Sequence, residues 1–328
     1  MLVYVVRRFF LALVTVGAIS VIAFAIIQLP PGDFVTAYIA QLQTMGTIVS
    51  QAEADAMRVE YGLNRPFPVQ YYKWVKRILQ GDFGLAMEYR RPVMEVIGDR
   101  LALTAVLTLT SIIFTWILAI PIGIYSAVRQ YSLGDYVFTF IGFLGLALPN
   151  FLLALVVLYI GFVVFDANVG GLFSPAYANA PYSFAKVIDL LNHLWLPSII
   201  LAIAGTAQLI RVLRANLLDE LRKPYVITAW SKGLSEWHLV LKYPVRIALN
   251  PFFSNIGNIL PALISGSAIV AVVLSLPTTG PLMLRALMTQ DMYLAGSFLL
   301  MLTILTLLGT LISDIILAIM DPRIRQTA

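Results

Sequence analysis

Residues 222–251 read RKPYVITAWSKGLSEWHLVLKYPVRIALNP and form the longest polar interruption in the C-terminal half of the chain. This 222–251 segment separates two apolar runs, each long enough to cross a membrane as a helix. Seven of the 22 Lys and Arg residues fall between Arg211 and Arg246. The apolar spacing between Pro224 and Pro244 predicts a short helix around Gly233. We therefore expect the rest of the chain to hold this segment at one membrane face.

The composition identifies a polytopic membrane protein. Apolar residues make up 60% of the 328 positions and charged residues 12%, whereas soluble domains are roughly half apolar and a quarter charged. The net charge of +5 does not predict a nucleic-acid partner, because the basic residues border apolar runs and form no patch interleaved with aromatic residues. The chain has no cysteine, and its two histidines lie far apart. We therefore predict no disulfide and no metal site.

Six apolar runs are predicted to span the membrane as helices. The first follows Arg7 and Arg8 and covers residues 9–29, so that residues 1–29 form an N-terminal transmembrane helix. A cleaved signal peptide is the alternative, but its apolar core is roughly 7 to 15 residues long, and this run is longer. The other five predicted spans cover residues 101–128, 136–165, 193–213, 247–276 and 294–320. Prolines inside these runs, such as Pro121 and Pro149, predict kinks.

Residues 30–100 have the composition of a soluble segment. They hold eight acidic and eight basic residues, several Gly and Pro turn signals, and a helix-like stretch at residues 70–79. A connector of this length is uncommon unless it folds. We therefore expect a small folded cap on one membrane face between the first and second spans.

Positive charge predicts the orientation. With a cytoplasmic N-terminus, twelve Lys and Arg residues lie at inner helix ends or in inner loops, whereas the short outer loops hold only Lys186 and Arg285. Long translocated segments largely escape this rule, so residues 30–100 are not counted. The rule predicts an external cap, a cytoplasmic loop at residues 214–246 and a cytoplasmic tail at residues 321–328.

No catalytic motif is present in the sequence. It contains no G-x-x-x-x-G-K-[ST] phosphate loop, no H-E-x-x-H and no G-x-S-x-G, so we predict no catalytic residue and no ATP hydrolysis by the chain alone. Asp314 is an acidic residue inside a predicted span, where a charge is by default a candidate ion or proton site. Its proximity to Asp321 at the inner end of that span favours a structural role.

Polar residues in the fifth predicted span mark a candidate translocation path. They are Ser254, Asn255, Asn258 and Ser265, of which the first, third and fourth recur at helical spacing. Such a face can line a hydrated path for a solute or allow close packing of helices, and both interpretations require the same residue types. Gln208 and Arg211, at the inner end of the fourth span, can likewise face the path or anchor the helix.

Within the 222–251 segment, YVITAWSKGLSE at residues 225–236 resembles the E-A-A-x-x-x-G loop of ABC importer permeases. It has the T-A-x-x-K-G-L form of the dipeptide and oligopeptide group, with Gly233 as the glycine. Further motifs resemble the first permease subunit of that peptide/nickel group: PGD at 31–33, YGLNRP at 61–66, GDFG at 81–84, RPV at 91–93 and DPRIR at 321–325. They extend over nearly the whole chain in the expected order.

This resemblance implies an all-α type I importer permease with six transmembrane helices, whose residues 101–320 form a five-helix core. Its implied partners are membrane lipid, a second related permease subunit, two ATP-binding subunits that hold ATP and Mg, and a periplasmic or lipid-anchored solute-binding protein. The implied location is the bacterial inner membrane, with both termini cytoplasmic. The chain itself would bind no cofactor.

In such a permease, the helix containing Gly233 would receive the motion of the ATPase subunits. The residues implied in this contact are Thr228, Ala229, Lys232, Gly233, Leu234, Glu236 and Trp237. Leu234, Trp237 and Leu241 follow i, i+3, i+7 spacing and predict one buried face. An amphipathic helix lying on lipid headgroups is the alternative. The sequence departs from the family pattern where Tyr243-Pro244 and Arg246 stand at the far end of the helix.

Peptides are the favoured substrates, and oligosaccharides or nickel chelates are alternatives within the same group. A stand-alone secondary transporter or channel would predict inverted repeats or several buried ionisable residues. Neither feature is evident in the sequence.

Overall fold

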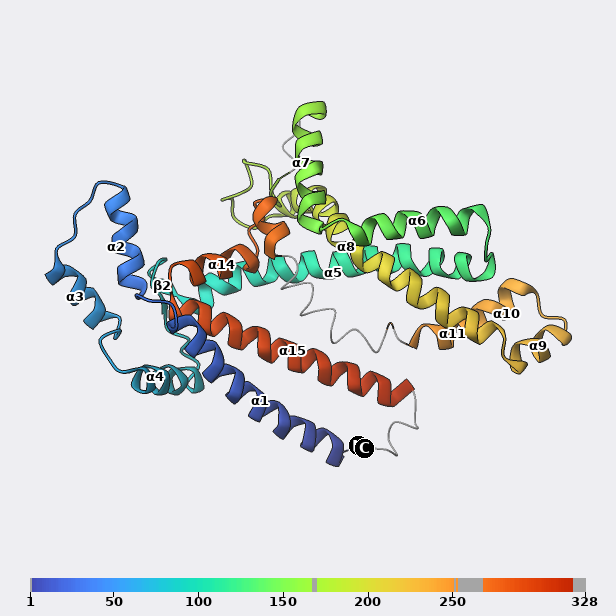
Figure 1. Cartoon of the computed structure of the whole chain (residues 1–328), viewed down its shortest axis with the longest axis horizontal. Coiled ribbons are helices and arrows are strands. Elements are labelled where there is room, and N and C mark those ends of the chain that lie inside the picture. Colours follow the sequence, from blue (N-terminus) through green and yellow to red (C-terminus); the bar gives the residue numbers. More distant parts are fainter. Residues whose placement is uncertain (1, 167–169, 251, 253–267, 321–328) are drawn as a thin grey trace. The chain divides into compact units, whose positions relative to one another are not determined.

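A computed structural model describes residues 2–166, 170–250, 252 and 268–320, with residues 2–9 and 312–320 described by their backbone alone. The described chain is almost entirely helical (Figure 1). It divides into two compact units, one made of Met1–Leu103 with Thr278–Leu308 and the other of Thr104–Pro277 with Gly309–Ala328. Two long helices, α5 (Val93–Val128) and α15 (Met292–Met320), contribute to both units.

Four described helices are long and apolar enough to cross a membrane. They are Phe10–Gln28 within α1 (Leu2–Gln28), α5, α8 (Phe184–Leu221), and Met292–Leu311 within α15. These helices coincide with the predicted spans at residues 9–29, 101–128, 193–213 and 294–320. The predicted span at 247–276 includes residues 251 and 253–267, which lie outside the described part of the chain.

The predicted span at residues 136–165 is broken next to Pro149, where the sequence predicted a kink. The chain forms α6 (Leu133–Ala147) and α7 (Asn150–Phe165), which meet at an angle of 99°. Leu148, the residue before Pro149, is extended, with φ −89 and ψ 124. The residue before a proline disfavours the helical region, and proline has no backbone N–H to continue the helical ladder. The two helices therefore provide at most one broken span.

The cap in the first unit is built from three short helices and a small hairpin. The helices are α2 (Phe34–Thr44), α3 (Gln51–Glu60) and α4 (Phe67–Leu79), and the antiparallel strands are β1 (Leu85–Ala86) and β2 (Arg91–Pro92). Asp33 caps α2 by accepting a hydrogen bond from the backbone amide of Thr36. Ser50 and Glu53 form a reciprocal capping box at the start of α3, which satisfies amides that the helix leaves unpaired.

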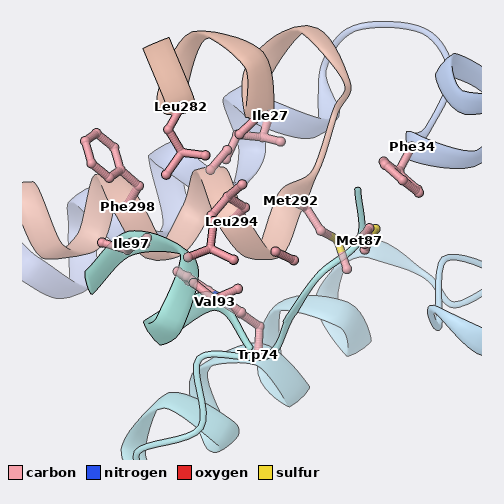
Figure 2. Packing of buried hydrophobic residues seen from close by; sticks show 14 of the residues in the cluster. Ile27, Phe34, Trp74, Met87, Val93, Ile97, Leu282, Met292, Leu294 and Phe298 are labelled. Atoms are coloured by element: carbon pink, nitrogen blue, oxygen red, sulfur yellow. The ribbon is translucent and has the colours of Figure 1, made fainter. Parts of the chain in front are cut away.

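The core of the cap is not closed within residues 30–100. Trp74, Phe34 and Met87 are buried together with Met292 and Leu294 of α15 (Figure 2). Leu282 of α14 (Thr279–Met288) and Phe298 of α15 belong to the same cluster. Three short helices expose more apolar surface than they can cover among themselves, so residues from the C-terminal third of the chain complete the core.

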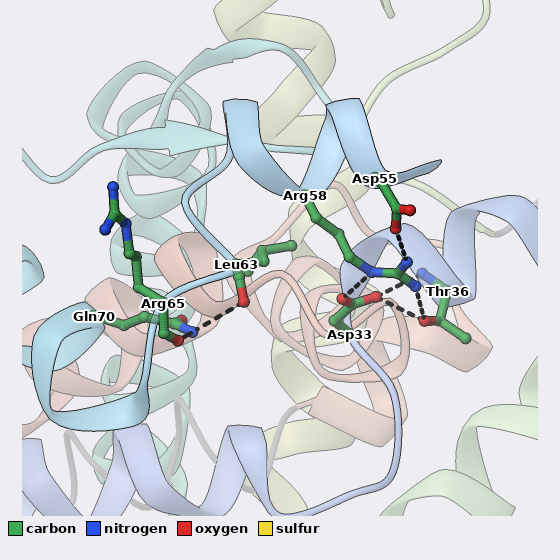
Figure 3. A network of polar contacts seen from close by, with 7 residues as sticks. All are labelled: Asp33, Thr36, Asp55, Arg58, Leu63, Arg65 and Gln70. Carbon is green, nitrogen blue, oxygen red and sulfur yellow. Dashed lines mark hydrogen bonds and ion pairs between the residues drawn. The ribbon is translucent and has the colours of Figure 1, made fainter. Parts of the chain in front are cut away.

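An ion-pair network joins α2 to α3. The Arg58 Nε lies 2.8 Å from Asp33 Oδ2, and its guanidinium also contacts Asp55 and the hydroxyl of Thr36 (Figure 3). Burial opposes ionisation of Asp33, but the hydrogen bonds from Arg58 and Thr36 outweigh it and lower the pKa of the carboxyl. In the α3–α4 turn, Gln70 donates to the carbonyl oxygens of Leu63 and Arg65.

In the second unit, α8 packs closely against both α5 and α6 (Figure 1). A Cβ atom added at Gly123 of α5 would lie 2.9 Å from Leu213 Cδ2, and one added at Gly145 of α6 would lie 2.7 Å from Ile203 Cγ2. Both distances are shorter than real side chains allow. Glycine therefore permits the close helix approach that is typical of membrane proteins.

Candidate functional site

The 222–251 segment begins with a chain reversal at the end of α8. The helix ends at Leu221, and α9 (Pro224–Ser231) begins with a proline in its first turn, where the missing N–H costs no hydrogen bond. The buried Glu220 carboxylate accepts hydrogen bonds from Lys223 Nζ and, at 2.7 Å, from the Tyr225 hydroxyl. Burial and the hydrogen bond to Glu220 raise the pKa of Tyr225. These contacts attach α9 to the end of α8.

Gly233 ends α9, so the predicted helix through Gly233 is wrong. Its backbone has φ +77, and Lys232 is the C-cap of α9. The Gly233 amide donates to the carbonyl of Trp230 at 2.9 Å. A left-handed glycine just after a helix is a common helix terminator, because it has no Cβ to oppose this conformation.

Two further short helices follow the glycine turn. Ser235 precedes α10 (Glu236–Lys242), and Pro244 opens α11 (Pro244–Ala248). Tyr243, between them, has φ −114 and ψ −76. The departure from the family pattern at Tyr243-Pro244 therefore coincides with the start of a third helix. Arg246 is exposed in the last turn of α11.

One face of these helices is buried. Leu239 and Val240 of α10 and Val245 of α11 are at most 6% exposed, and they pack in a cluster with Leu213 and Leu217 of α8. Val226 of α9 and Ala248 of α11 belong to the same cluster. The segment is therefore packed onto α8 through a continuous apolar contact.

The opposite face leaves large apolar side chains exposed. We call Ile227, Trp230, Trp237 and Leu241 the outer face; they are 59%, 72%, 54% and 54% exposed. Lys232, Glu236 and Lys242 are exposed beside them. The predicted stripe of Leu234, Trp237 and Leu241 is divided, because Leu234 is half-buried against the inner cluster. The glycine turn between α9 and α10 breaks the single helical register on which that stripe depended.

The other predicted coupling residues occupy both faces. Thr228 is exposed, and its hydroxyl donates to the carbonyl of Pro224 at 3.0 Å. Ala229 is half-buried against the inner cluster. Trp230 and Ile227 were not among the coupling residues predicted from the sequence. The match to the E-A-A motif favoured its small and polar positions, such as Thr228 and Ala229. An exposed tryptophan is, however, a stronger signal of a contact surface.

Of the predicted path residues, only two are described. Ser254, Asn255, Asn258 and Ser265 lie outside the described residues, as does the side chain of Asp314. Gln208 and Arg211 are exposed on α8, and the Arg211 guanidinium donates to Gln208 Oε1 at 3.0 Å. Within the part of the chain that the structure describes, no group of three or more His, Cys, Asp or Glu residues is placed to hold a metal ion.

Comparison with known proteins gives consistent matches along the whole chain. A family model described as the inner membrane component of binding-protein-dependent transport systems matches residues 119–326. A second model, for the N-terminal part of such membrane components, matches residues 1–108. Together they cover both the cap and the 222–251 segment.

Individual relatives match over their full length. The chain is 35% identical over 325 residues to the oligopeptide transport system permease protein AppB of Bacillus subtilis, covering 99% of each chain. It is 30% identical over 330 residues to the glutathione transport system permease protein GsiC of Salmonella choleraesuis, again covering 99% of each. The dipeptide transport system permease protein DppB of Alkalihalophilus pseudofirmus is 29% identical over 349 residues, covering 99% of this chain and 100% of the relative.

Proposed function

Because the chain belongs to the family of inner membrane components of binding-protein-dependent transport systems, we propose that it is the permease subunit of an ATP-driven importer that carries peptides. The relatives that match over full length are named for the transport of oligopeptides, dipeptides and glutathione, which is itself a tripeptide. The apolar helices are those of a multi-pass membrane protein. We propose that this chain forms half of the translocation path and pairs with a second, related permease subunit.

The observation that carries the coupling proposal is the outer face of α9 and α10. Two tryptophans and two aliphatic residues are more than half exposed on helices that already bury their opposite side. Exposed apolar patches mark contact surfaces, and tryptophan is among the residues that contribute most to protein interfaces. We propose that an ATP-binding subunit, which holds ATP and Mg, covers the outer face, and that a second such subunit serves the partner permease.

The packing of the segment explains how movement can pass from that contact to the membrane helices. Leu239 and Val245 pack against Leu213 and Leu217 of α8, while Glu220 and Tyr225 tie the start of α9 to the end of the same helix. A well-packed segment moves as a rigid body and does not deform continuously. Closure of the ATP-binding subunits would therefore shift α8 and open or close the path.

The orientation proposed for this function follows the charge distribution. Both termini and the 214–246 loop are cytoplasmic, and the cap at residues 30–100 is periplasmic, where it receives the solute-binding protein. We propose that Ser254, Asn255, Asn258 and Ser265 line the path together with Gln208. Arg211 is a path candidate as well, and its alternative role is to anchor the inner end of α8.

The test removes the outer face without changing the inner one. The chain is expressed together with the other importer subunits, and Trp230→Ala with Trp237→Ala is compared with Trp195→Ala. Trp195 is 52% exposed on α8 and lies outside the 222–251 segment, so it is a matched control. We expect the double variant to co-purify at least about tenfold less ATP-binding subunit, since loss of a hot spot costs about 2 kcal/mol or more.

Co-purification of the ATP-binding subunit at the wild-type level by the double variant would refute the docking proposal and favour the lipid-headgroup alternative. Uptake of labelled dipeptide by the wild-type importer in proteoliposomes, with its solute-binding protein inside or outside the vesicle, tests substrate and direction separately. Transport without any solute-binding protein would contradict the importer assignment.

A further inference from the structure

A groove between α6 and α8 is lined by charged and polar residues at one end and by apolar residues at the other, as a bound phospholipid would require. We propose that it binds one anionic phospholipid, with the phosphate on Arg211 and an acyl chain along α6. The groove has a volume of about 290 Å³ and lies within the second unit. Its described lining includes none of the exposed apolar residues of α9 and α10.

The groove changes from polar to apolar along α6. Asp135 and Tyr136 line it in the first turn of that helix, whereas Phe138, Phe143 and Leu146 line it further along. From residue 135 to residue 146 the helix rises by about 16 Å. Half of the hydrocarbon core of a bilayer is about 15 Å thick. The length of the groove along α6 therefore matches the acyl chain of one leaflet, and its polar end lies beside the α5–α6 turn.

Small residues line the bottom of the groove, where α6 and α8 approach each other. Gly142 of α6 faces Ala207 of α8, and a Cβ added at Gly142 would lie 3.7 Å from the Ala207 Cβ. The two helices approach closely here, and the larger Phe138 and Phe143 side chains form the walls along α6. An acyl chain matches this shape because it is narrow, flexible and entirely apolar.

Charge at the polar end favours an anionic ligand. Arg214 forms two hydrogen bonds with Asp135, at 3.1 Å and 2.9 Å, so these two charges neutralise each other. Arg211 lies one helical turn away and is exposed, and its hydrogen-bond partner is the neutral amide of Gln208. Among the described residues, Arg211 forms no ion pair with a carboxylate. A guanidinium without a carboxylate partner on a membrane-spanning helix favours a counter-anion, and a phosphodiester accepts two of its parallel N–H groups.

The surroundings of the polar end also favour lipid. Tyr131 and Tyr136 line the groove and are 69% and 60% exposed, and tyrosine is enriched where membranes meet water. Phe140 and Phe143 of the same helix are also more than half exposed. A permease subunit seated here would bury Arg211 and would have to supply a carboxylate for it. A phospholipid supplies the anion and the apolar chain in one molecule.

The proposal is tested on the importer as it assembles, reconstituted in nanodiscs of phosphatidylcholine that contain a small fraction of phosphatidylglycerol. After exchange into detergent, bound phosphatidylglycerol is counted by native mass spectrometry. We expect saturation at one phosphatidylglycerol per chain for the wild type. Arg211→Gln should reduce this occupancy at least tenfold, and Arg211→Lys should keep part of it because the charge remains. Arg129→Gln removes a charge from the adjacent α5–α6 turn outside the groove and should have no effect.

Equal loss of lipid in the Arg211→Gln and Arg129→Gln variants would overturn the proposal, since it would show unspecific attraction to a basic surface. Unchanged lipid with weaker association of the second permease subunit would assign the groove to that subunit. Unchanged lipid with reduced peptide uptake would place Arg211 in the path. Absence of saturable phosphatidylglycerol on the wild type would refute the site without any variant. Each result concerns lipid occupancy and leaves the test of peptide import independent.

Discussion

The cap and the 222–251 segment are both made of short helices between long apolar ones, but their tryptophans differ in burial. Trp74 and Phe34 of the cap are 1% and 3% exposed, whereas Trp230 and Trp237 of the segment are 72% and 54% exposed. Burial of a large aromatic side chain contributes several kcal/mol to folding. Trp74 and Phe34 stabilise the core that the cap forms with α14 and α15. The tryptophans of the segment can make the same contribution only when a partner covers them.

Charged side chains differ in burial between the two regions in the same way. Asp291, just before α15, has no exposed surface, and its carboxylate accepts hydrogen bonds from the amides of Met87 in the cap and of Leu294 in α15, at 2.7 Å and 3.0 Å. In the segment, Lys232 and Glu236 are exposed. The cap therefore has the interactions of a completed fold, whereas the segment has those of one half of an interface. Substitutions at four positions, Trp74, Trp230, Asp291 and Gly233, test this difference.

The largest expected effect is on Trp74. Trp74→Ala should destabilise the cap by about 3 to 5 kcal/mol, because it leaves a cavity among Phe24, Tyr71 and Gly296. Trp74→Phe should cost less, since the ring is retained and Trp74 Nε1 has no hydrogen-bond partner in the described structure. The measurement is the rate of protease cleavage within residues 30–100 of the reconstituted protein as denaturant is added.

The same measurement on Trp230→Ala should change stability by no more than about 0.5 kcal/mol, as is usual for exposed positions. A cost for Trp230→Ala comparable to that for Trp74→Ala would remove the distinction between the two regions.

The next largest effect concerns pH and Asp291. Burial raises the pKa of Asp291 to about 6 from a model-compound value of 3.8, against the opposing hydrogen bonds from the Leu294, Met87 and Glu88 amides. The folded state therefore binds the proton more tightly than the unfolded state. The stabilisation is fully present below pH 3.8 and is lost as the pH rises through about 6, with a total of about 3 kcal/mol.

The check is the melting temperature of the purified protein between pH 4 and pH 7, compared between wild type and Asp291→Asn. Other carboxylates also titrate in this range, so the difference between the two proteins isolates Asp291. The melting temperature of the wild type should fall relative to that of the variant as the pH rises. Parallel profiles would show that burial of Asp291 does not control the stability of the cap.

A smaller loss of stability than at Trp74 or Asp291 is expected at Gly233. With φ +77 and no atom within 4 Å of an added Cβ, a side chain here meets backbone strain and no steric clash. Gly233→Val should cost about 1–2 kcal/mol in the turn, and Gly233→Asn less, because asparagine tolerates this conformation. The measurement is peptide taken up per ATP hydrolysed, which should fall for valine more than for asparagine. Equal losses for both residues would indicate a direct contact at Gly233 in place of a conformational requirement.

The sequence predicted the parts of the molecule that local chemistry controls. Apolar length placed four of the described spans, and the motif around Gly233 located the candidate site. Pro149 predicted the bend between α6 and α7. The end of α9 at Gly233 was also within reach of sequence reasoning, since glycine after a helix is a local signal. The apolar periodicity from residue 224 to residue 244 predicted one helix through Gly233, and that helix was too long.

By itself, the sequence determined that this protein is a helical membrane protein whose motifs are those of binding-protein-dependent importers, with a polar segment on which its coupling is proposed to depend. Only the tertiary structure decided that Met292 and Leu294 complete the core of the cap, that Asp291 binds the Met87 amide, and that Arg214 pairs with Asp135 while Arg211 does not. Periodicity shows that a helix has an apolar face, but the surface that covers this face comes from a distant part of the chain. The mutual packing of all the helices selects that surface, since burial is favourable between any two apolar faces that fit.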